Sequence, residues 1–133
     1  MIDDYFKICL LKANNYYKAI QILSNSKENL NDGICINSHM CIDRCLQSFL
    51  ISKNIDFRPI YTLNDLQKIC SQFDSHFNNF DLGNLSKLKD KITSEEELYF
   101  SSDNEAKKFY KTAVEVKDFV FEKLNVTEDD LKL

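Results

Sequence analysis

Four side chains that are able to do chemistry lie close together in one apolar stretch: Cys35, His39, Cys41 and Cys45. Zinc sites usually join two cysteines spaced two to four residues apart to a second such pair, and Cys41 and Cys45 have no convincing second pair. A nucleophilic thiol needs a base beside it, and Cys35 and His39 are the one pair spaced to touch on a helix. We expect buried thiols here, with thiol catalysis as the alternative, and no metal or cofactor.

Asp43 and Arg44 form the first candidate binding pair, because they lie inside the most apolar stretch of the chain, residues 34–51. Charged side chains in such a setting must be paired or must reach solvent. One interpretation is a structural ion pair or the exposed edge of a helix. The other is a polar contact with a ligand or partner, in a groove between helices or across a dimer axis.

Tyr99 and Phe100 are the second candidate pair, because they precede the last predicted helix in a polar context. Most other aromatic residues fall at helical spacing, which is typical of a core. We therefore expect Tyr99 and Phe100 to line an opening at one end of the molecule. The chain has no phosphate-binding glycine loop, zinc-protease motif or serine nucleophile motif, so no catalytic residue is assigned.

The composition favours one soluble helical domain. The 133 residues are 44% hydrophobic and 29% charged, with only two glycines and one proline, so turn-rich β-folds are disfavoured. The net charge of -4 argues against nonspecific nucleic-acid binding, which uses clustered Lys and Arg, although a small local basic patch stays open.

The N-terminal stretch carries two acids where a signal peptide would have basic residues, and no apolar run reaches the length of a membrane span. The five cysteines are an odd number and mostly fall in apolar stripes, which is typical of reduced, buried thiols. We expect a cytoplasmic protein that does not associate with membranes.

Apolar residues recur every three or four positions in several stretches, which predicts four or five helices joined by short loops, an antiparallel bundle. The first helix covers residues 3–24, and the second follows a turn at Asp32-Gly33 and ends near residue 53. The third starts at the N-cap Thr62 and fades over residues 75–84, and a shorter fourth helix ends near Ile92, with another turn over residues 93–97. The last helix starts at a capping box, Ser102 to Glu105, and runs to Leu124.

Apolar side chains outside the main stripes predict a homodimer. Met40, Leu50 and Ile51 lie off the main arc of the second helix, and Phe119 and Phe121 lie off that of the last. A large exposed apolar patch usually marks an interface, and two-fold dimers are the commonest closed assembly. The rival interpretation is that other helices of the same chain cover these residues.

Three stretches follow the pattern of one family. NSHMCIDRCLQSFL matches a second helix often written HASQAIEKALKALL, and Pro59, Tyr61-Thr62-Leu63 and Leu66 match the stretch P-x-T-H-x-L-x-x-L. Tyr99-Phe100 and the segment from Asp103 to Leu124 match an aromatic segment and a final helix. Over nearly its full length the chain thus resembles the HEPN domain, with residues 1–126 as the single HEPN-like bundle and 127–133 as a short acidic tail.

The resemblance implies a dimer, often paired with a minimal nucleotidyltransferase in toxin–antitoxin or defence systems. Catalytic HEPN members are ribonucleases with an Arg and a His near the start of the last helix, but the matching segment here, EELYFSSDNEA, has neither. We therefore expect a noncatalytic binding module for such a partner, a nucleotide or RNA. A divergent RNA- or nucleotide-processing enzyme and a purely structural helical adaptor are the alternatives.

Overall fold

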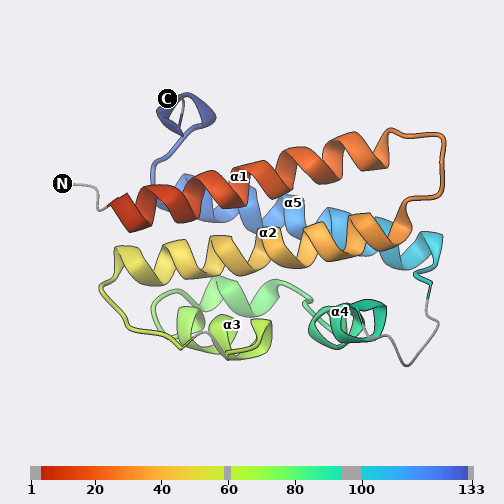
Figure 1. The fold of residues 1–133 in the computed structure, drawn as a ribbon. Helices are drawn as coiled ribbons and strands as arrows, with labels where there is room; N and C mark the ends of the chain where they lie inside the picture. The colour runs from red at the N-terminus through yellow and green to blue at the C-terminus, as the bar shows by residue number, and fades with distance from the viewer. Residues whose placement is uncertain (1–3, 59–60, 94–99, 132–133) are drawn as a thin grey trace.

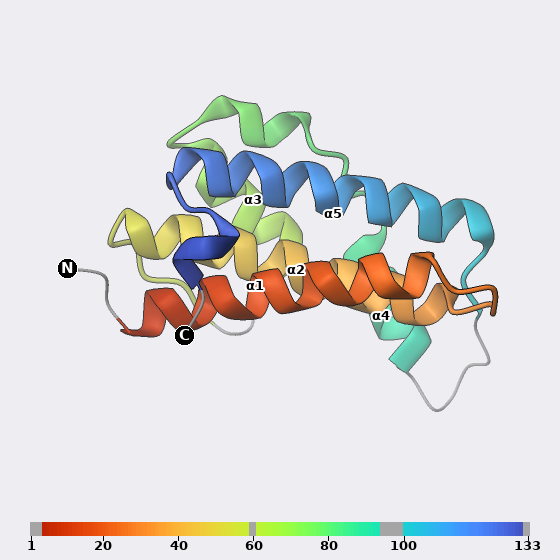
Figure 2. The ribbon, with the colours of Figure 1, turned by 90° about the horizontal axis from the view of Figure 1, so that it is seen from above.

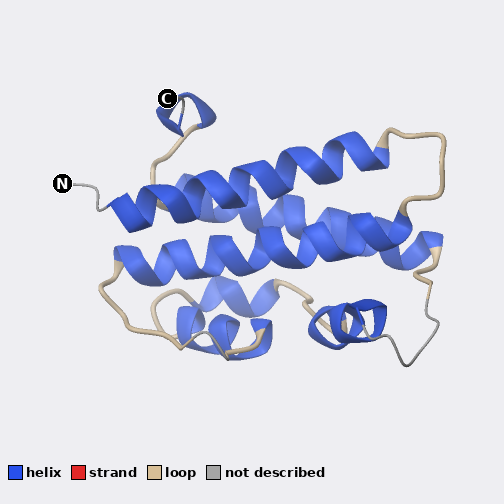
Figure 3. Cartoon of the chain, in the orientation of Figure 1, coloured by secondary structure: helices blue, strands red, loops and turns tan. Residues whose placement is uncertain are grey.

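The chain is all-α in the computed structural model, which describes residues 4–58, 61–93 and 100–131. These residues contain no strand (Figure 3). The elements are α1 (Asp4–Ser24), α2 (Asn31–Ser52), α3 (Leu63–Ser71), the 3₁₀ helix η1 (Ser75–Asn79), α4 (Leu85–Thr93), α5 (Asp103–Lys123) and the 3₁₀ helix η2 (Glu128–Leu131). The predicted all-α class and the bundle-like packing of its helices are confirmed.

Helix α2 lies in the middle of the molecule. It packs against α1 and α5 along most of its length, and against α3 and α4 on a further side. Figure 1 shows α1 running antiparallel to α2, with α3 and α4 below α2, and Figure 2 shows α5 on the far side of the α1–α2 pair. Residues 34–51, the most apolar stretch of the chain, thus lie in the central helix.

Two helices begin at capping boxes, in which side chains accept hydrogen bonds from backbone amides at the start of the helix. The Ser102 hydroxyl accepts from the Glu105 amide at 3.1 Å, and the Glu105 carboxylate accepts from the Ser102 amide at 3.0 Å. Thr62 and Asp65 make the same exchange at the start of α3. The predicted N-caps of both helices are confirmed.

The predicted turn at Asp32-Gly33 is wrong, because α2 begins at Asn31 and both residues lie in its first turn. The glycine is explained by packing, since a Cβ atom on Gly33 would lie 3.3 Å from a methyl group of Leu23 on α1. The missing side chain thus lets the two helices approach closely near their connection. The Asp32-Gly33 dipeptide, although typical of turns, here lies within α2 and allows close packing of α2 on α1.

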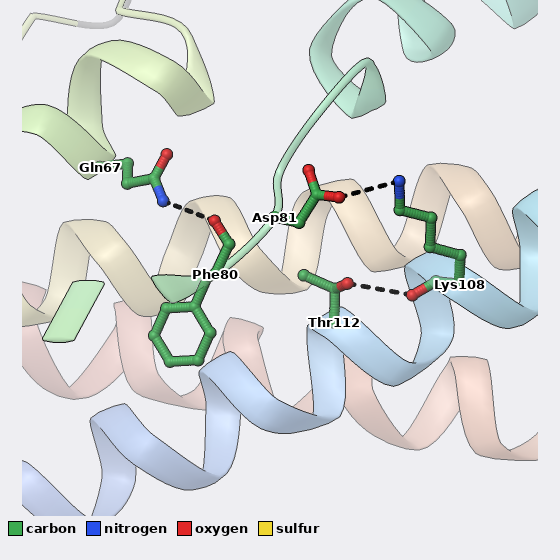
Figure 4. Close-up of polar contacts among 5 residues, drawn as sticks. All are labelled: Gln67, Phe80, Asp81, Lys108 and Thr112. Atoms are coloured by element: carbon green, nitrogen blue, oxygen red, sulfur yellow. Dashed lines mark hydrogen bonds and ion pairs between the residues drawn. The ribbon is translucent and has the colours of Figure 1, made fainter. Parts of the chain in front are cut away.

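The layer below α2 is held by side chains from several elements (Figure 4). Gln67 on α3 donates to the carbonyls of Phe77 and Phe80 at 2.7 and 2.8 Å. Asp81 forms an ion pair with Lys108 of α5 at 3.0 Å. These contacts fix the segment that leads into α4.

Several apolar residues that motivated the dimer prediction are covered within one chain. Leu50 and Phe121 are buried, and Phe119 packs edge-on against Phe77 with ring centroids 5.1 Å apart. For Leu50 and Phe121 the rival interpretation is correct, and Phe77 of η1 supplies part of the cover of Phe119. Met40 and Ile51 are half-buried, and the dimer itself stays a prediction.

The segment after α5 folds back onto the bundle. Asn125 has a φ of 55°, and the Val126 amide donates to the Phe121 carbonyl at 2.9 Å, which reverses the chain direction. Leu131 then enters the hydrophobic core, where it is 5% exposed. Part of the stretch predicted as an acidic tail therefore contributes to the core, and the division at residue 126 stays a prediction.

Candidate functional site

Asp43 and Arg44 are joined by a third side chain, Gln47, one turn further along α2. The Gln47 amide nitrogen donates to the Asp43 carboxylate at 2.9 Å, and the Arg44 guanidinium donates to the Gln47 carbonyl oxygen at 3.4 Å. All three side chains are half-buried. The structure thus places both predicted residues in one polar cluster, bridged by an amide, and no direct ion pair between the two is found.

The cluster lies on the side of α2 that faces away from α5. Hydrogen bonding to Cys41 and burial raise the pKa of the Cys45 thiol, while the charge of Lys117 on α5 opposes the rise. Cys41 and Cys45 therefore face α5. Asp43 lies two residues from each, or about 160–200° around the helix at about 100° per residue.

The cluster is only partly satisfied. Burial raises the pKa of the Asp43 carboxyl, although the charges of Arg44 and of Lys89 on α4 and the bond from Gln47 act in the opposite direction. The Nε atom of Arg44 is buried and has no hydrogen-bond partner among the described residues. Buried donors in folded proteins nearly always have partners, so this guanidinium donor is unusual.

Helix α1 passes beside this cluster and carries exposed apolar side chains of its own. The Cys9 thiol donates to the Arg44 carbonyl at 3.4 Å, which places this part of α1 against the cluster. Tyr5 and Ile8, one turn apart on the same side of α1, are 52% and 49% exposed. We call Tyr5, Ile8, Asp43, Arg44 and Gln47 together the open face.

His39 is set apart from this cluster by its environment. Its Nδ1 atom is buried without a hydrogen-bond partner among the described residues. Burial lowers the pKa of the imidazole to about 4, and Lys89 on α4 lowers it further while Asp90 opposes. The ring is therefore neutral near pH 7, and the possible pairing of His39 with Cys35 finds no support, because Cys35 lies near Ser101 and Glu105 instead.

Phe100 lies at one end of the bundle, as predicted, and Tyr99 lies outside the described residues. Phe100 is 81% exposed and lines a hollow of about 440 Å³ with the start of α2. There the Ser101 amide donates to Asp32 at 2.7 Å, and the Asn31 side chain donates to Asp103 at 2.7 Å. An exposed aromatic ring beside a hollow is able to stack on a flat ligand. The binding role of Phe100 stays a prediction.

All five cysteines are free and buried, which confirms the prediction that they are apolar core residues. Burial raises the pKa of the Cys70 thiol to about 12 and raises that of Cys9. Protonated thiols are poor nucleophiles. Among the described residues, no three His, Cys, Asp or Glu side chains come together in a way that would hold a metal ion.

Lys117 on α5 is a buried charge that the sequence analysis missed. It follows Val116 of the apolar stripe and is only 8% exposed. Its ammonium group lies 4.3 Å from the centre of the Tyr17 ring and 4.8 Å from that of Phe121. The available signal was its spacing, because Lys117 is four residues from both Ala113 and Phe121, which are buried on the same helix.

The fold and the site define an all-α protein, a bundle of five helices in the described residues, with a half-buried polar cluster on an open face. Comparison of the chain with protein-family models, with curated proteins and with solved structures found no match in any of the three. No helix in the described part of the chain combines the length and the apolar character needed to span a membrane.

Proposed function

We propose that the chain is a noncatalytic, HEPN-like binding module that forms a two-fold dimer through the open face. The observation that carries the dimer is the buried, unpartnered Nε of Arg44 next to the half-buried carboxylate of Asp43. The buried donor and the half-buried carboxylate belong to neighbouring residues of α2, and α1, which packs beside them, carries exposed apolar side chains.

A two-fold dimer would give both the Arg44 guanidinium and the Asp43 carboxylate a hydrogen-bond partner. In a two-fold dimer the same patch meets itself, so a patch that carries one cation and one anion is self-complementary. Asp43 would then accept from the partner's Arg44, and Arg44 would donate to the partner's Asp43. Charge-assisted bonds of this kind are stronger than neutral ones, and partial burial protects them from screening by salt.

The apolar part of the open face contributes the area. Tyr5 and Ile8 are about half exposed in one chain, and covering them removes apolar surface from water at about 25 cal/mol per Å². Tyrosine is also among the residues enriched at interfaces, because it combines a large ring with a polar tip.

The noncatalytic assignment is supported by the positions of both histidines. His39 is neutral and half-buried between α2 and α4, and the His76 ring stacks on Phe119 at 4.4 Å. Neither histidine makes a hydrogen bond to an arginine within the described residues. An Arg–His pair able to act on RNA is thus not assembled from these two residues.

The partner is proposed from the HEPN resemblance: a minimal nucleotidyltransferase, with a nucleotide or RNA end as the other candidate, in a toxin–antitoxin or defence setting. The exposed ring of Phe100 beside the hollow at the end of the bundle is the surface proposed for this contact. We expect Phe100→Ala to weaken binding of that partner by about tenfold, since loss of one stacked ring costs about 1–3 kcal/mol. Binding at wild-type strength would contradict this contact.

The dimer is tested by a charge swap. Sedimentation equilibrium of the wild type should give about twice the chain mass of 15.6 kDa. Asp43→Arg and Arg44→Asp should each weaken the dimer by at least about tenfold, because each places like charges across the axis. The double variant carrying both changes should restore it, because the two charges have only exchanged positions.

The control is Glu115→Arg, a charge reversal on the exposed side of α5, which should leave the mass unchanged. Circular dichroism of each variant confirms that it is folded. A wild type that stays monomeric on concentration, or a double variant no better than the single ones, contradicts the proposed interface.

A further inference from the structure

The buried Lys117 is completed by a segment from beyond α5. Its ammonium group lies 3.9 Å from the carboxylates of both Asp118 and Glu128. Asp118 is its neighbour on α5, while Glu128 belongs to η2, after the chain reversal at Asn125. A buried ammonium group between aromatic rings needs an anion nearby. One of its two carboxylate neighbours, Glu128, comes from η2.

The same segment places one apolar side chain in a groove between α1 and the end of α5. Leu131 is buried there, three residues after Glu128, while residues 127–130 are exposed. Figure 2 shows η2 lying over α1 beside the end of α5. We call residues 125–131 the strap. Its contacts with the bundle include the buried Leu131, the half-buried Val126, and the ion pair of Glu128 with Lys117.

The strap does not fill the groove. A hollow of about 590 Å³ remains between α1 and the strap, with apolar side chains of Phe6 and Leu10 on one side and Leu131 on the other. The hollow opens to the surface, and the charged residues Asp4, Lys7 and Asp130 also line it. An apolar side chain larger than leucine would therefore fit at the place of Leu131.

We infer that the groove between α1 and α5 is a docking site for an acidic segment of another protein, and that the strap occupies it in the free chain. The partner segment would carry a carboxylate three residues before a leucine or a larger apolar residue. Its carboxylate would replace Glu128 at Lys117, and its apolar side chain would replace Leu131. The strap shows the chemistry that the groove accepts, and this inference does not depend on the proposed dimer.

The test uses full-length chain and a labelled peptide of residues 125–133 as the probe, followed by nuclear magnetic resonance. Leu131→Asp in the chain should release the strap, so the peptide should bind this variant at least about tenfold more tightly than the wild type, where the strap competes. Adding Lys117→Gln to Leu131→Asp should weaken binding by about tenfold or more. Lys111→Gln, an exposed lysine of the same helix, is the matched control and should change nothing.

Changes in the probe test the same chemistry without altering the fold. A peptide with Glu128→Gln or Leu131→Asp should bind at least about tenfold more weakly, and one with Leu131→Phe should bind at least as tightly. Equal binding to wild type and Leu131→Asp chain, or equal binding of the Glu128→Gln peptide, overturns the proposal. A wild type whose dimer is dissolved by Leu131→Asp would show that a second copy exchanges its strap into the groove, and would also overturn it.

Discussion

At the scale of single residues, His39 makes stability depend on pH. Burial lowers its folded pKa to about 4 from an ordinary value of 6.5. Between these values the unfolded chain binds a proton that the folded chain refuses, so falling pH favours unfolding. The stabilising effect is complete above about pH 6.5 and is lost progressively as the pH falls to about 4.

We expect this loss to disappear in His39→Gln, which has no proton to gain. Urea unfolding at pH 7 and pH 4.5 should show the wild type losing up to a few kcal/mol, from about 1.4 kcal/mol per pKa unit. His39→Gln should lose less over the same interval. His76→Asn, a substitution of the exposed histidine, should keep the wild-type decline, and an equal decline in all three proteins would contradict the role of His39.

At the scale of elements, the start of α5 depends on one hydroxyl group. Ser102 accepts from the Glu105 amide, and α5 packs along α2 through the core. Ser102→Ala should lower the free energy of unfolding by about 0.5–2 kcal/mol, the usual cost of losing an N-cap. Ser71→Ala, at the exposed end of α3, should change it by no more than about 0.5 kcal/mol. Urea unfolding monitored by circular dichroism measures both, and an unchanged Ser102→Ala would mean that the cap is not needed.

The helices were predictable where local chemistry and periodicity agree. Ser102 and Thr62 start helices because their side chains satisfy nearby amides, a relation visible in three or four residues. Gly33 was misread because its role is set by Leu23 on another helix, a contact that no local pattern records. Phe77 was missed for the same reason, since its short 3₁₀ helix has no long repeat and its burial comes from Phe49 at 4.7 Å.

The sequence allowed Asp43 and Arg44 to be selected as candidate site residues, but it did not predict how their side chains are arranged. Charged residues in an apolar stretch marked Asp43 and Arg44, but the bridging role of Gln47 depends on side-chain conformation. Lys117 was hidden because lysine is ordinarily a surface residue. Its burial requires the ring of Tyr17 and the carboxylate of Glu128. Tyr17 lies on α1, far from Lys117 along the chain, and Glu128 lies on η2, after the chain reversal at Asn125.

At the scale of the whole molecule, one central helix gives the bundle two unlike sides. Helix α2 carries Cys41 and Cys45 on the side of Lys117 of α5, and the bonded pair of Asp43 and Gln47 on a different side. The strap and the open face are different surfaces: the strap binds at Lys117 on α5, and the open face combines α1 with the opposite side of α2. The two proposed contacts, a second copy on the open face and an acidic segment at the strap, therefore use separate surfaces.

The hydrogen bonds that tie Asn31 and Asp32 to the start of α5 have an electrostatic consequence. Helices α2 and α5 begin at the same end of the molecule (Figure 1), so the positive ends of two helix dipoles lie together there. Asp32 and Asp103 place carboxylates on those ends and use them to join the two helices. The positive potential that would draw a phosphate to this end is thus already neutralised. A nucleotide held beside Phe100 would be held by its base, with its phosphates turned away from the helix ends.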